Sequence, residues 1–343
     1  PESRENSVGV IHKDYLVVFG GCGGSRGKER SDFVFRRNLK HQSCMWEKMK
    51  CEGISPPPTS SGTGTLVRDE MWVYGGENQF HDNKGKGKSR DVHGNMFALH
   101  LDTFVWRPVT TKGTLSTNFL NPMPKRGHTT TFVAEGNFRK ARILSPPVGL
   151  TATRAPRMRD VLLSFGGSGP EESFNVDRYN NDLYVLDMST LEWHLARVEG
   201  DVPSPRSMHT TTLVPRKGLF VYGGITASIS PVREGPMLDK MAHSMVKDPI
   251  APSDVFMLQL PTKTTAYTWT KLKTSGRPPP PRYGHSAALN EANDFGKVRY
   301  IYYYGGRLAS TLEPQNSVYV FDIRSKPATW STARTAGMAP SAR

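Results

Sequence analysis

The chain is poor in cysteine and has no long apolar run. It carries 3 Cys in 343 residues, all within the first 51 positions. Three clustered cysteines cannot cross-link a chain of this size, which excludes a disulfide-stapled secreted domain and favours a reducing compartment. No apolar stretch approaches the roughly 20 residues that span a bilayer, so the sequence predicts no membrane-spanning helix. We therefore expect an intracellular, cytoplasmic protein. The chain does not begin with methionine, so an organellar targeting segment stays open.

Acidic residues are also scarce relative to basic ones, and the excess is uneven. There are 31 Asp and Glu against 45 Lys and Arg, a formal charge of +14. Residues 26–50 hold eight Lys or Arg against three acids, and residues 125–160 hold eight against two. Such tracts attract RNA, acidic proteins or anionic membranes. No RNA-recognition motif, zinc knuckle or helix-turn-helix pattern accompanies them. The candidate contact residues in these tracts are Arg36, Arg37, Lys125, Arg139, Lys140, Arg142, Arg157 and Arg159.

Glycine, by contrast, recurs in a fixed context. Five apolar strands end in a diglycine: LVVFGG (16–21), MWVYGG (71–76), LLSFGG (162–167), LFVYGG (219–224) and YIYYYGG (300–306). Glycine reaches positive φ without steric cost, so each pattern is typical of a buried strand that runs into a tight turn. Five copies predict a repeat protein. The glycines are Gly20, Gly21, Gly75, Gly76, Gly166, Gly167, Gly223, Gly224, Gly305 and Gly306.

Three further landmarks accompany each diglycine in most units. A second strand follows, such as DLYVLDM (182–188) or SVYVFDI (317–323). A tryptophan stands after it, and then a proline-rich turn with an arginine, as in VPSPRSMH (202–209) and PPPPRYGH (278–285). Because each landmark recurs once per unit, we expect these side chains to be structural. They are Trp46, Trp106, Trp193, Trp269, Trp330, Arg126, Arg206 and Arg282.

This order of landmarks resembles the kelch motif, and the resemblance covers essentially the whole chain. It implies an all-β, kelch-type β-propeller in which each motif forms one four-stranded blade. The match weakens at the start. The second unit opens with PPPTSSGTG (56–64), without the arginine or the histidine, and the first keeps Arg4 but has Ser7 in place of the histidine. Five blade motifs are visible, and a ring of five, six or seven blades stays open.

We interpret the chain as one propeller domain, residues 1–343, cut from a longer protein. Its units are approximately 1–55, 56–121, 122–201, 202–277 and 278–343. Successive second glycines are 55, 91, 57 and 82 residues apart, so two intervals carry long insertions, at about 134–160 and 225–253. Loop insertions in a repeat protein often carry its individual function. The second contains an apolar face at helical spacing, which either packs on its own propeller or docks a partner, with Met237, Met241 and Met245 as candidates.

Catalytic and metal-binding patterns are weak. Some kelch-like propellers, such as galactose oxidase, are copper enzymes, but no matching set of tyrosines, histidines and a Cys-Tyr pair stands out here. His128, His209 and His285 occupy one repeated position, which is typical of a structural residue. The spacing from Cys44 to Cys51 does not match the usual zinc-ligand spacing. We therefore expect no cofactor, no metal and no enzyme activity.

The resemblance also implies where a partner would bind. In kelch-like propellers the turn after the diglycine and the turn before the first strand surround the mouth of the central channel. We place these partner-binding candidates there: Glu77, Asn78, Ile225, Thr226, Arg307, Asn6, Met208 and Tyr283. Tyrosine and arginine supply much of the binding energy in protein interfaces. A protein partner, bound by a scaffold or adaptor, is thus the leading hypothesis. A basic subunit of a ribonucleoprotein is the main alternative, and a galactose-oxidase-like enzyme is a weaker one.

The tryptophan assignment makes a stability prediction. Trp193→Ala should lower the free energy of unfolding by about 3–5 kcal/mol, because a buried aromatic side chain is lost. Denaturant titration of both proteins measures the difference. An unchanged midpoint would show that Trp193 is not part of the core.

Overall fold

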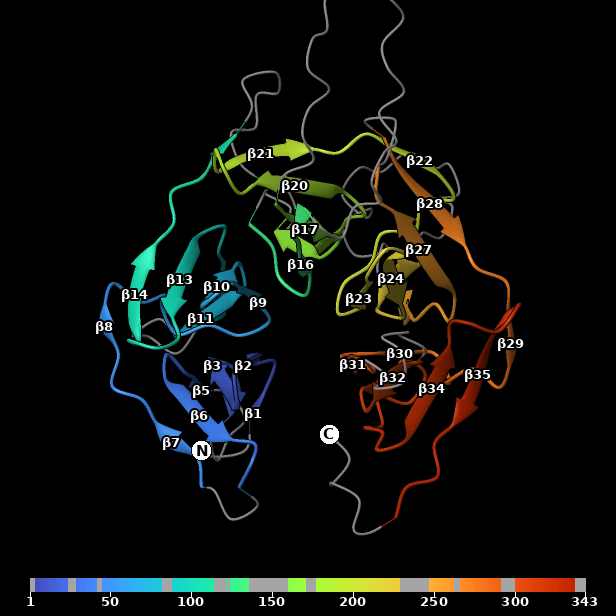
Figure 1. The fold of residues 1–343 in the computed structure, drawn as a ribbon, viewed down its shortest axis with the longest axis horizontal. Helices are drawn as coiled ribbons and strands as arrows, with labels where there is room; N and C mark the ends of the chain where they lie inside the picture. Colours follow the sequence, from blue (N-terminus) through green and yellow to red (C-terminus); the bar gives the residue numbers. More distant parts are fainter. Residues whose placement is uncertain are drawn as a thin grey trace, which may run out of the picture.

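The computed structural model describes residues 4–23, 29–41, 45–81, 88–113, 122, 124–135, 160–170, 177–228, 247–261, 266–290 and 300–336. Strands are the dominant secondary structure of these residues, which contain no α-helix. They form ten sheets, of which the five larger ones are blades placed around a central channel (Figure 1). The expected all-β propeller is confirmed, in a five-blade arrangement. The helix expected around Met237, Met241 and Met245 lies outside the described residues, as does most of both insertions.

Each blade is an antiparallel meander whose first strand lines the channel (Figure 1). Blade one contains β2 (Val8–His12), β3 (Tyr15–Phe19), β6 (Val34–Asn38) and β7 (Glu47–Lys48). Blade two contains β9 (Thr63–Val67), β10 (Glu70–Tyr74), β13 (Met96–His100) and β14 (Val105–Pro108). Blade three contains β16 (Thr129–Val133), β17 (Val161–Phe165), β20 (Leu183–Asp187) and β21 (Glu192–Leu195). Blade four contains β23 (Thr210–Val214), β24 (Gly218–Tyr222), β27 (Val255–Gln259) and β28 (Tyr267–Lys271). Blade five contains β31 (Ser286–Asn290), β32 (Tyr300–Tyr304), β34 (Val318–Asp322) and β35 (Ala328–Thr332).

A short parallel strand joins each unit to the next blade. After leaving blade one, the chain pairs β8 (Glu52–Gly53) in parallel with β14 of blade two. Blades three, four and five gain the same outer-edge strand from the preceding unit. These strands are β15 (Lys112–Gly113), β22 (Val198–Gly200) and β29 (Thr274–Gly276). Neighbouring blades are therefore linked by backbone hydrogen bonds at the rim as well as by side-chain packing.

Small ribbons cover one end of the channel, where every diglycine lies, and we call this end of the propeller the mouth. In blade one, β1 (Arg4–Glu5) pairs with β4 (Cys22–Gly23), which pairs with β5 (Glu29–Arg30). In blade five, β30 (Arg282–Tyr283) pairs with β33 (Arg307–Leu308). The other ribbons are β11 (Glu77–His81) with β12 (Lys88–Val92), β18 (Ser168–Pro170) with β19 (Asp177–Tyr179), and β25 (Thr226–Ser228) with β26 (Lys247–Ile250).

Aromatic pairs hold successive blades together. The residue before each diglycine packs on the tryptophan of the next unit, as Tyr74 does on Trp193, with ring centroids 5.5 Å apart. The same contact recurs at 4.9–5.0 Å in the pairs Phe19–Trp106, Phe165–Trp269 and Tyr222–Trp330. These four tryptophans are 1–3% exposed. One apolar cluster thus fills each junction from blade one to blade five.

The faces between blade five and blade one differ from the other junctions. The two blades stand apart in the ribbon, close to the two ends of the chain (Figure 1). Trp46 of blade one is only half-buried, and so is Tyr304, the residue before the diglycine of blade five. Ile11 on the inner strand of blade one is 58% exposed. Across this opening an ion pair joins Arg307 to Glu5, with the nitrogen and oxygen 3.5 Å apart.

Because of this difference, Trp330 and Trp46 should contribute unequally to the free energy of unfolding. Trp330→Ala should cost about 3–5 kcal/mol of unfolding free energy, as expected for a buried aromatic. Trp46→Ala should cost less than half as much, because its side chain already meets solvent. Urea titration of the two variants gives the comparison. Equal losses would contradict the inequality of the two sites.

Candidate functional site

A chain of backbone hydrogen bonds encircles most of the mouth. One residue of each unit's first turn donates its N–H to the carbonyl of the equivalent residue in the preceding unit. Ser61 bonds to Asn6 at 3.0 Å, Gly127 to Ser61 at 2.8 Å, Met208 to Gly127 at 2.6 Å and Gly284 to Met208 at 2.9 Å. All five have φ between 55° and 65°. A cavity of about 470 Å³ lies within this ring.

The positive φ of the ring residues carries a conformational cost for every residue except glycine. A residue with a side chain loses roughly 1–2 kcal/mol in this left-handed conformation. Glycine avoids the cost at two of the five positions, while Asn6, Ser61 and Met208 accept it. The shared conformation keeps the five turns in the same orientation. Differences between units at the mouth are therefore differences of side chain and not of backbone.

Beside this ring, five equivalent residue pairs carry different chemistry. Each joins the residue before the ring position to the residue after the diglycine, in antiparallel register. Blades one, two and three have Glu5 with Cys22, Ser60 with Glu77, and Arg126 with Ser168. Blades four and five have Ser207 with Ile225, and Tyr283 with Arg307. A repeated backbone that presents different side chains is suited to recognising an asymmetric ligand.

Two of the partner candidates are buried. Glu77 is 6% exposed and Asn78 is 7% exposed, so each offers little surface to a partner. The Glu77 carboxylate lies 2.9 Å from Arg30 and 3.0 Å from Arg126. These three side chains come from blades one, two and three. A carboxylate buried in this way is stable because two guanidinium groups compensate its lost hydration.

The other mouth candidates are accessible. Asn6 is exposed, and Ile225, Thr226, Met208 and Tyr283 are half-buried. Arg307 is half-buried as a residue, and its side chain is 41% exposed. The structure therefore brings the candidates of blades four and five together on one side of the mouth. Methionine, isoleucine and tyrosine give this side an apolar character beside one arginine.

Arg126 does not stand at the position of the other repeated arginines. Arg206 and Arg282 stand three residues before a histidine, and Lys125 stands three before His128. Lys125 is 1% exposed, and its carbonyl accepts a bond from Gly76, as the Arg206 carbonyl does from Gly167. Arg126 instead occupies the mouth position that Ser207 and Tyr283 occupy. The doubled Lys-Arg hid this register in the sequence.

Burial also governs the charge of Lys125. It lowers the pKa of the ammonium group to about 7, with Asp182 opposing the shift. The Nζ atom lies 4.9 Å from the centre of the Tyr184 ring. In units one, four and five a guanidinium reaches the carbonyl of the first glycine, for example from Arg4 to Gly20 at 3.0 Å and from Arg282 to Gly305 at 2.9 Å. Lys125 is thus a shorter substitute for the repeated arginine.

Sequence reasoning missed Glu5, Arg30 and Ser61 as mouth residues. Ser61 was missed because the second unit lacks the arginine and histidine that mark the turn. The inner strand TGTLV (63–67) corresponds to TTTFV (129–133) of the next unit. Counting back two residues from TTTFV reaches Gly127, and the same count from TGTLV would have found Ser61. Arg30 reaches Glu77 from a separate ribbon, and no spacing in the sequence indicates that contact.

Arg36 and Arg37 of the 26–50 tract lie on β6 of blade one. Arg36 lies 2.7 Å from Glu47 and over the Tyr15 ring, at 4.8 Å from its centre. Arg37 lies on β6, opposite Leu16 of β3. Of the second tract, Lys125 is buried, and Arg139, Lys140, Arg142, Arg157 and Arg159 lie outside the described residues. Arg36 and Lys125 are therefore engaged in contacts within the fold.

Three histidines at the base of the mouth are buried between blades. His285 is 6% exposed, and its Nε2 lies 2.9 Å from the Thr210 hydroxyl of blade four. Burial, followed by repulsion from Arg282, lowers the pKa of His285 to about 3. Burial likewise holds the pKa values of His128 and His209 well below the usual value. All three are therefore neutral at physiological pH. Each contacts a threonine of the preceding blade and so joins two neighbouring blades.

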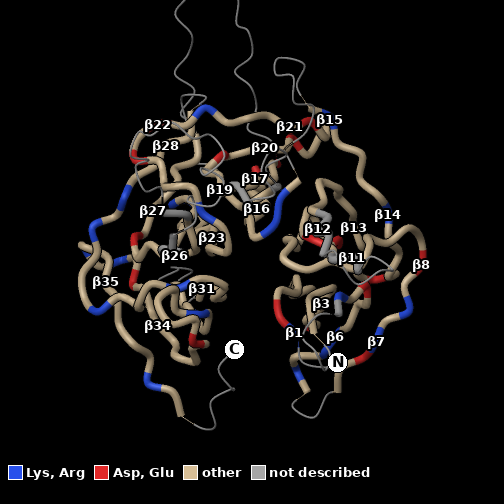
Figure 2. The backbone as a smooth tube through the Cα atoms, turned by 180° about the vertical axis from the view of Figure 1, so that it is seen from behind, with Lys and Arg blue, Asp and Glu red and all other residues tan. Residues whose placement is uncertain are grey.

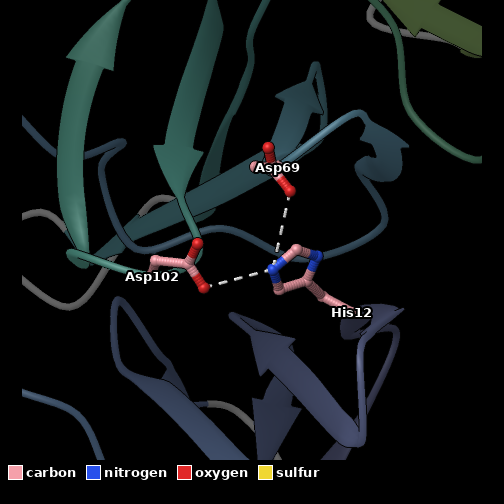
Figure 3. Close-up of side chains that lie close together, drawn as sticks. All are labelled: His12, Asp69 and Asp102. Atoms are coloured by element: carbon pink, nitrogen blue, oxygen red, sulfur yellow. Dashed lines mark hydrogen bonds and ion pairs between the residues drawn. The ribbon is translucent and has the colours of Figure 1, made fainter.

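A His-Asp-Asp group lies at the opposite end of blades one and two (Figure 3). The His12 Nε2 atom is 3.3 Å from Asp102 and 3.9 Å from Asp69. These residues could offer three ligand atoms to a cation. However, the Lys13 ammonium lies 2.6 Å from Asp102 and lowers its pKa. The geometry is that of an ion-pair cluster that fastens the turn of blade one to two turns of blade two.

Comparisons with known proteins agree with this architecture. The chain matches the KLHDC2/KLHL20/DRC7 kelch-repeats domain over residues 1–138 and 149–343. The chain belongs to the kelch-repeat family. Kelch propellers are generally protein-interaction modules that bind protein partners. Among the described residues, no helix is long and apolar enough to cross a membrane.

Individual kelch relatives are distant. The chain is 24% identical to Kelch domain-containing protein 2 of Bos taurus over 68% of its own length and 52% of that protein. It is 26% identical to Host cell factor of Drosophila melanogaster over 84% of its length and 16% of that protein. It is 23% identical to human Kelch domain-containing protein 1 over 65% of its length and 50% of that protein. The chain thus spans about half the length of the two kelch-domain relatives.

The buried histidines make stability depend on pH. The pKa of His285 is lower in the folded protein than in the unfolded chain, so only the unfolded chain takes up a proton as pH falls below about 6.5. Each such histidine should therefore remove roughly 1.4 kcal/mol of stability per pH unit below that value. His285→Gln should be less stable at pH 7 and show a shallower decline toward pH 4.5 in chemical denaturation. A slope identical to that of the parent would contradict this assignment.

Proposed function

We propose that this kelch propeller is a non-catalytic scaffold or adaptor that captures a peptide or loop of a protein partner at its mouth. The observation that carries the proposal is the set of five equivalent mouth pairs. Their backbone is constant, whereas the side chains that are not buried include Glu5, Arg126, Ile225, Tyr283 and Arg307. Such variation on a constant backbone suits the recognition of a segment whose side chains differ along its length. The family's general role as a protein-binding module supports the same assignment.

Blades four and five should supply most of the binding energy. Met208, Ile225 and Tyr283 present apolar surface that remains partly open to solvent, with Arg307 beside them. Protein interfaces concentrate their energy in a few aromatic and arginine side chains within an apolar centre. On the other side of the mouth, the charges of Glu77 and Arg126 already compensate each other at 3.0 Å. We therefore expect the partner segment to lie against blades four and five.

The ribonucleoprotein alternative has less support. Arg30 and Arg36 pair with acids of this chain, at 2.9 Å and 2.7 Å. A basic side chain that is paired within the fold contributes less to phosphate binding, because it must first leave its partner. A protein ligand is consequently the better assignment for the described surface.

The mouth assignment can be tested with purified full-length protein and a phage library of random peptides. Enriched peptides should bind the Tyr283→Ala and Arg307→Ala variants at least about tenfold more weakly, because truncating an interface hot spot costs about 2 kcal/mol or more. Fluorescence anisotropy of labelled peptides measures the change. Arg197→Ala is the matched control, since Arg197 is exposed and pairs locally with Glu199 at 2.9 Å.

Two results would count against the proposal. One is a panel of enriched peptides that binds both mouth variants and the control equally well. The other is capture of protein partners from a cell lysate that depends entirely on RNA and disappears after nuclease treatment. Melting curves of the variants establish that a loss of binding is not a loss of folding.

A further inference from the structure

A second cavity lies between blades four and five, at the strand ends away from the mouth. Its volume is about 550 Å³. One wall is the turn between β23 and β24, which precedes Gly218, and another is the turn between β34 and β35. The connection from β28 to β29 closes the outer side. Since β24 runs from Gly218 to the diglycine, the cavity and the mouth stand at opposite ends of blade four.

Among the described residues, every charged side chain that lines this cavity is basic. They are Arg216, Lys217, Lys273 and Lys326. Lys and Arg are also seen along the outer edge of blades four and five (Figure 2). The Lys217 ammonium donates to the Ile323 carbonyl at 2.8 Å, which fixes it at the wall. Burial, and then the charges of Arg324 and Lys326, lower the pKa of Lys217, while Asp322 opposes the shift. The cavity is therefore a region of positive potential.

At the corresponding turns of blades one and two, a basic residue pairs with an acid of the following blade: Lys13 lies 2.6 Å from Asp102, and Arg68 lies 3.0 Å from Asp160. Between blades four and five, none of the described residues that line the cavity is acidic. The cavity lining therefore brings four basic residues together around an open space.

The floor of the cavity is apolar and adaptable. It is formed by Phe220, Met257, Leu260, Leu272 and Ile323. Phe220 and Ile323 are buried at 4% and 7% exposure, whereas Met257, Leu260 and Leu272 are half-buried. Ligand pockets typically combine such an apolar lining with a few polar groups at the rim, in a volume of about 300–1,000 Å³. A flexible methionine also lets the floor adjust to a side chain.

We propose that this cavity is a second binding site, which takes an acidic peptide segment carrying one large apolar side chain. The apolar side chain enters between the two blades and contacts Met257 and Leu272. Carboxylates on either side of it pair with Lys273 and Lys326 at the rim. The site is separate from the mouth, so one propeller can hold two segments at once, of one partner or of two.

A peptide fits this site better than a nucleic acid does. Proteins that bind single-stranded nucleic acid offer exposed aromatic faces on which bases stack. Within the described part of the lining, Phe220 is the only aromatic residue, and its side chain is buried. The remaining lining offers aliphatic and thioether surface, which suits a leucine or phenylalanine side chain. Three of the four basic lining residues are lysines, which supply charge without the planar fork that favours bidentate phosphate binding.

Fluorescence anisotropy with defined probes tests the site. The probes are a fluorescein-labelled peptide of Asp and Glu with a central Leu, the same peptide with a central Gly, and its Lys-for-acid counterpart. The Leu peptide should bind, and both others should bind at least about tenfold more weakly. Lys273→Glu combined with Lys326→Glu should also weaken the Leu peptide at least about tenfold, because each lost charge-assisted contact is replaced by repulsion.

Matched variants separate this site from the mouth and from general charge. Lys50→Glu combined with Lys112→Glu makes the same change of charge at exposed positions of other blades and should leave binding unchanged. Tyr283→Ala should also leave it unchanged. The proposal is overturned if the control pair weakens the Leu peptide as much as the test pair, if the Gly peptide binds equally well, or if an oligouridine of equal charge displaces the peptide and binds more tightly.

Discussion

The close approach of two backbones at the first four diglycines is the contact on which the propeller depends. A Cβ atom on Gly75 would lie 2.5 Å from the Lys125 carbonyl oxygen and 2.6 Å from a ring carbon of His128. At Gly223 the corresponding distances to Arg282 and His285 are 2.8 Å and 2.6 Å. No residue with a side chain can occupy such a position unless the blades move apart. The turn of each unit therefore sits directly against the strand end of the preceding one.

Several other features follow from that contact. Because the blades approach so closely, the aromatic residue before the diglycine reaches the tryptophan of the next unit, and the histidine at the turn reaches a threonine of the preceding inner strand. The same approach brings the mouth turns within hydrogen-bonding distance of one another. The aromatic residues, tryptophans and histidines of the repeat are used in these junctions between blades. The neighbouring positions at the mouth differ in side chain from unit to unit. Recognition at the mouth is thus possible because stability is provided elsewhere in the repeat.

Much of the fold could be predicted from the sequence, because a repeat displays the same physical requirement several times. Diglycines, tryptophans and proline-rich turns indicated the five blades and the order of their strands. The site was harder to predict. Glu77 follows a diglycine, as its counterparts in the other units do, but it is buried against two arginines that are distant in the sequence. Lys125 and Arg126 are adjacent cations, and only the distance to His128 distinguishes the buried one from the one at the mouth. Pairings between blades are not periodic, so sequence spacing does not reveal them.

The ion pair between Arg307 and Glu5 has a mechanical consequence. The junctions from blade one to blade five are filled by apolar clusters, whereas between blade five and blade one the structure shows this pair of partly exposed charges. A pair of this kind contributes only about 0–1 kcal/mol and is screened by salt. Higher ionic strength should therefore weaken the contact between blade five and blade one, while the four apolar junctions stay intact.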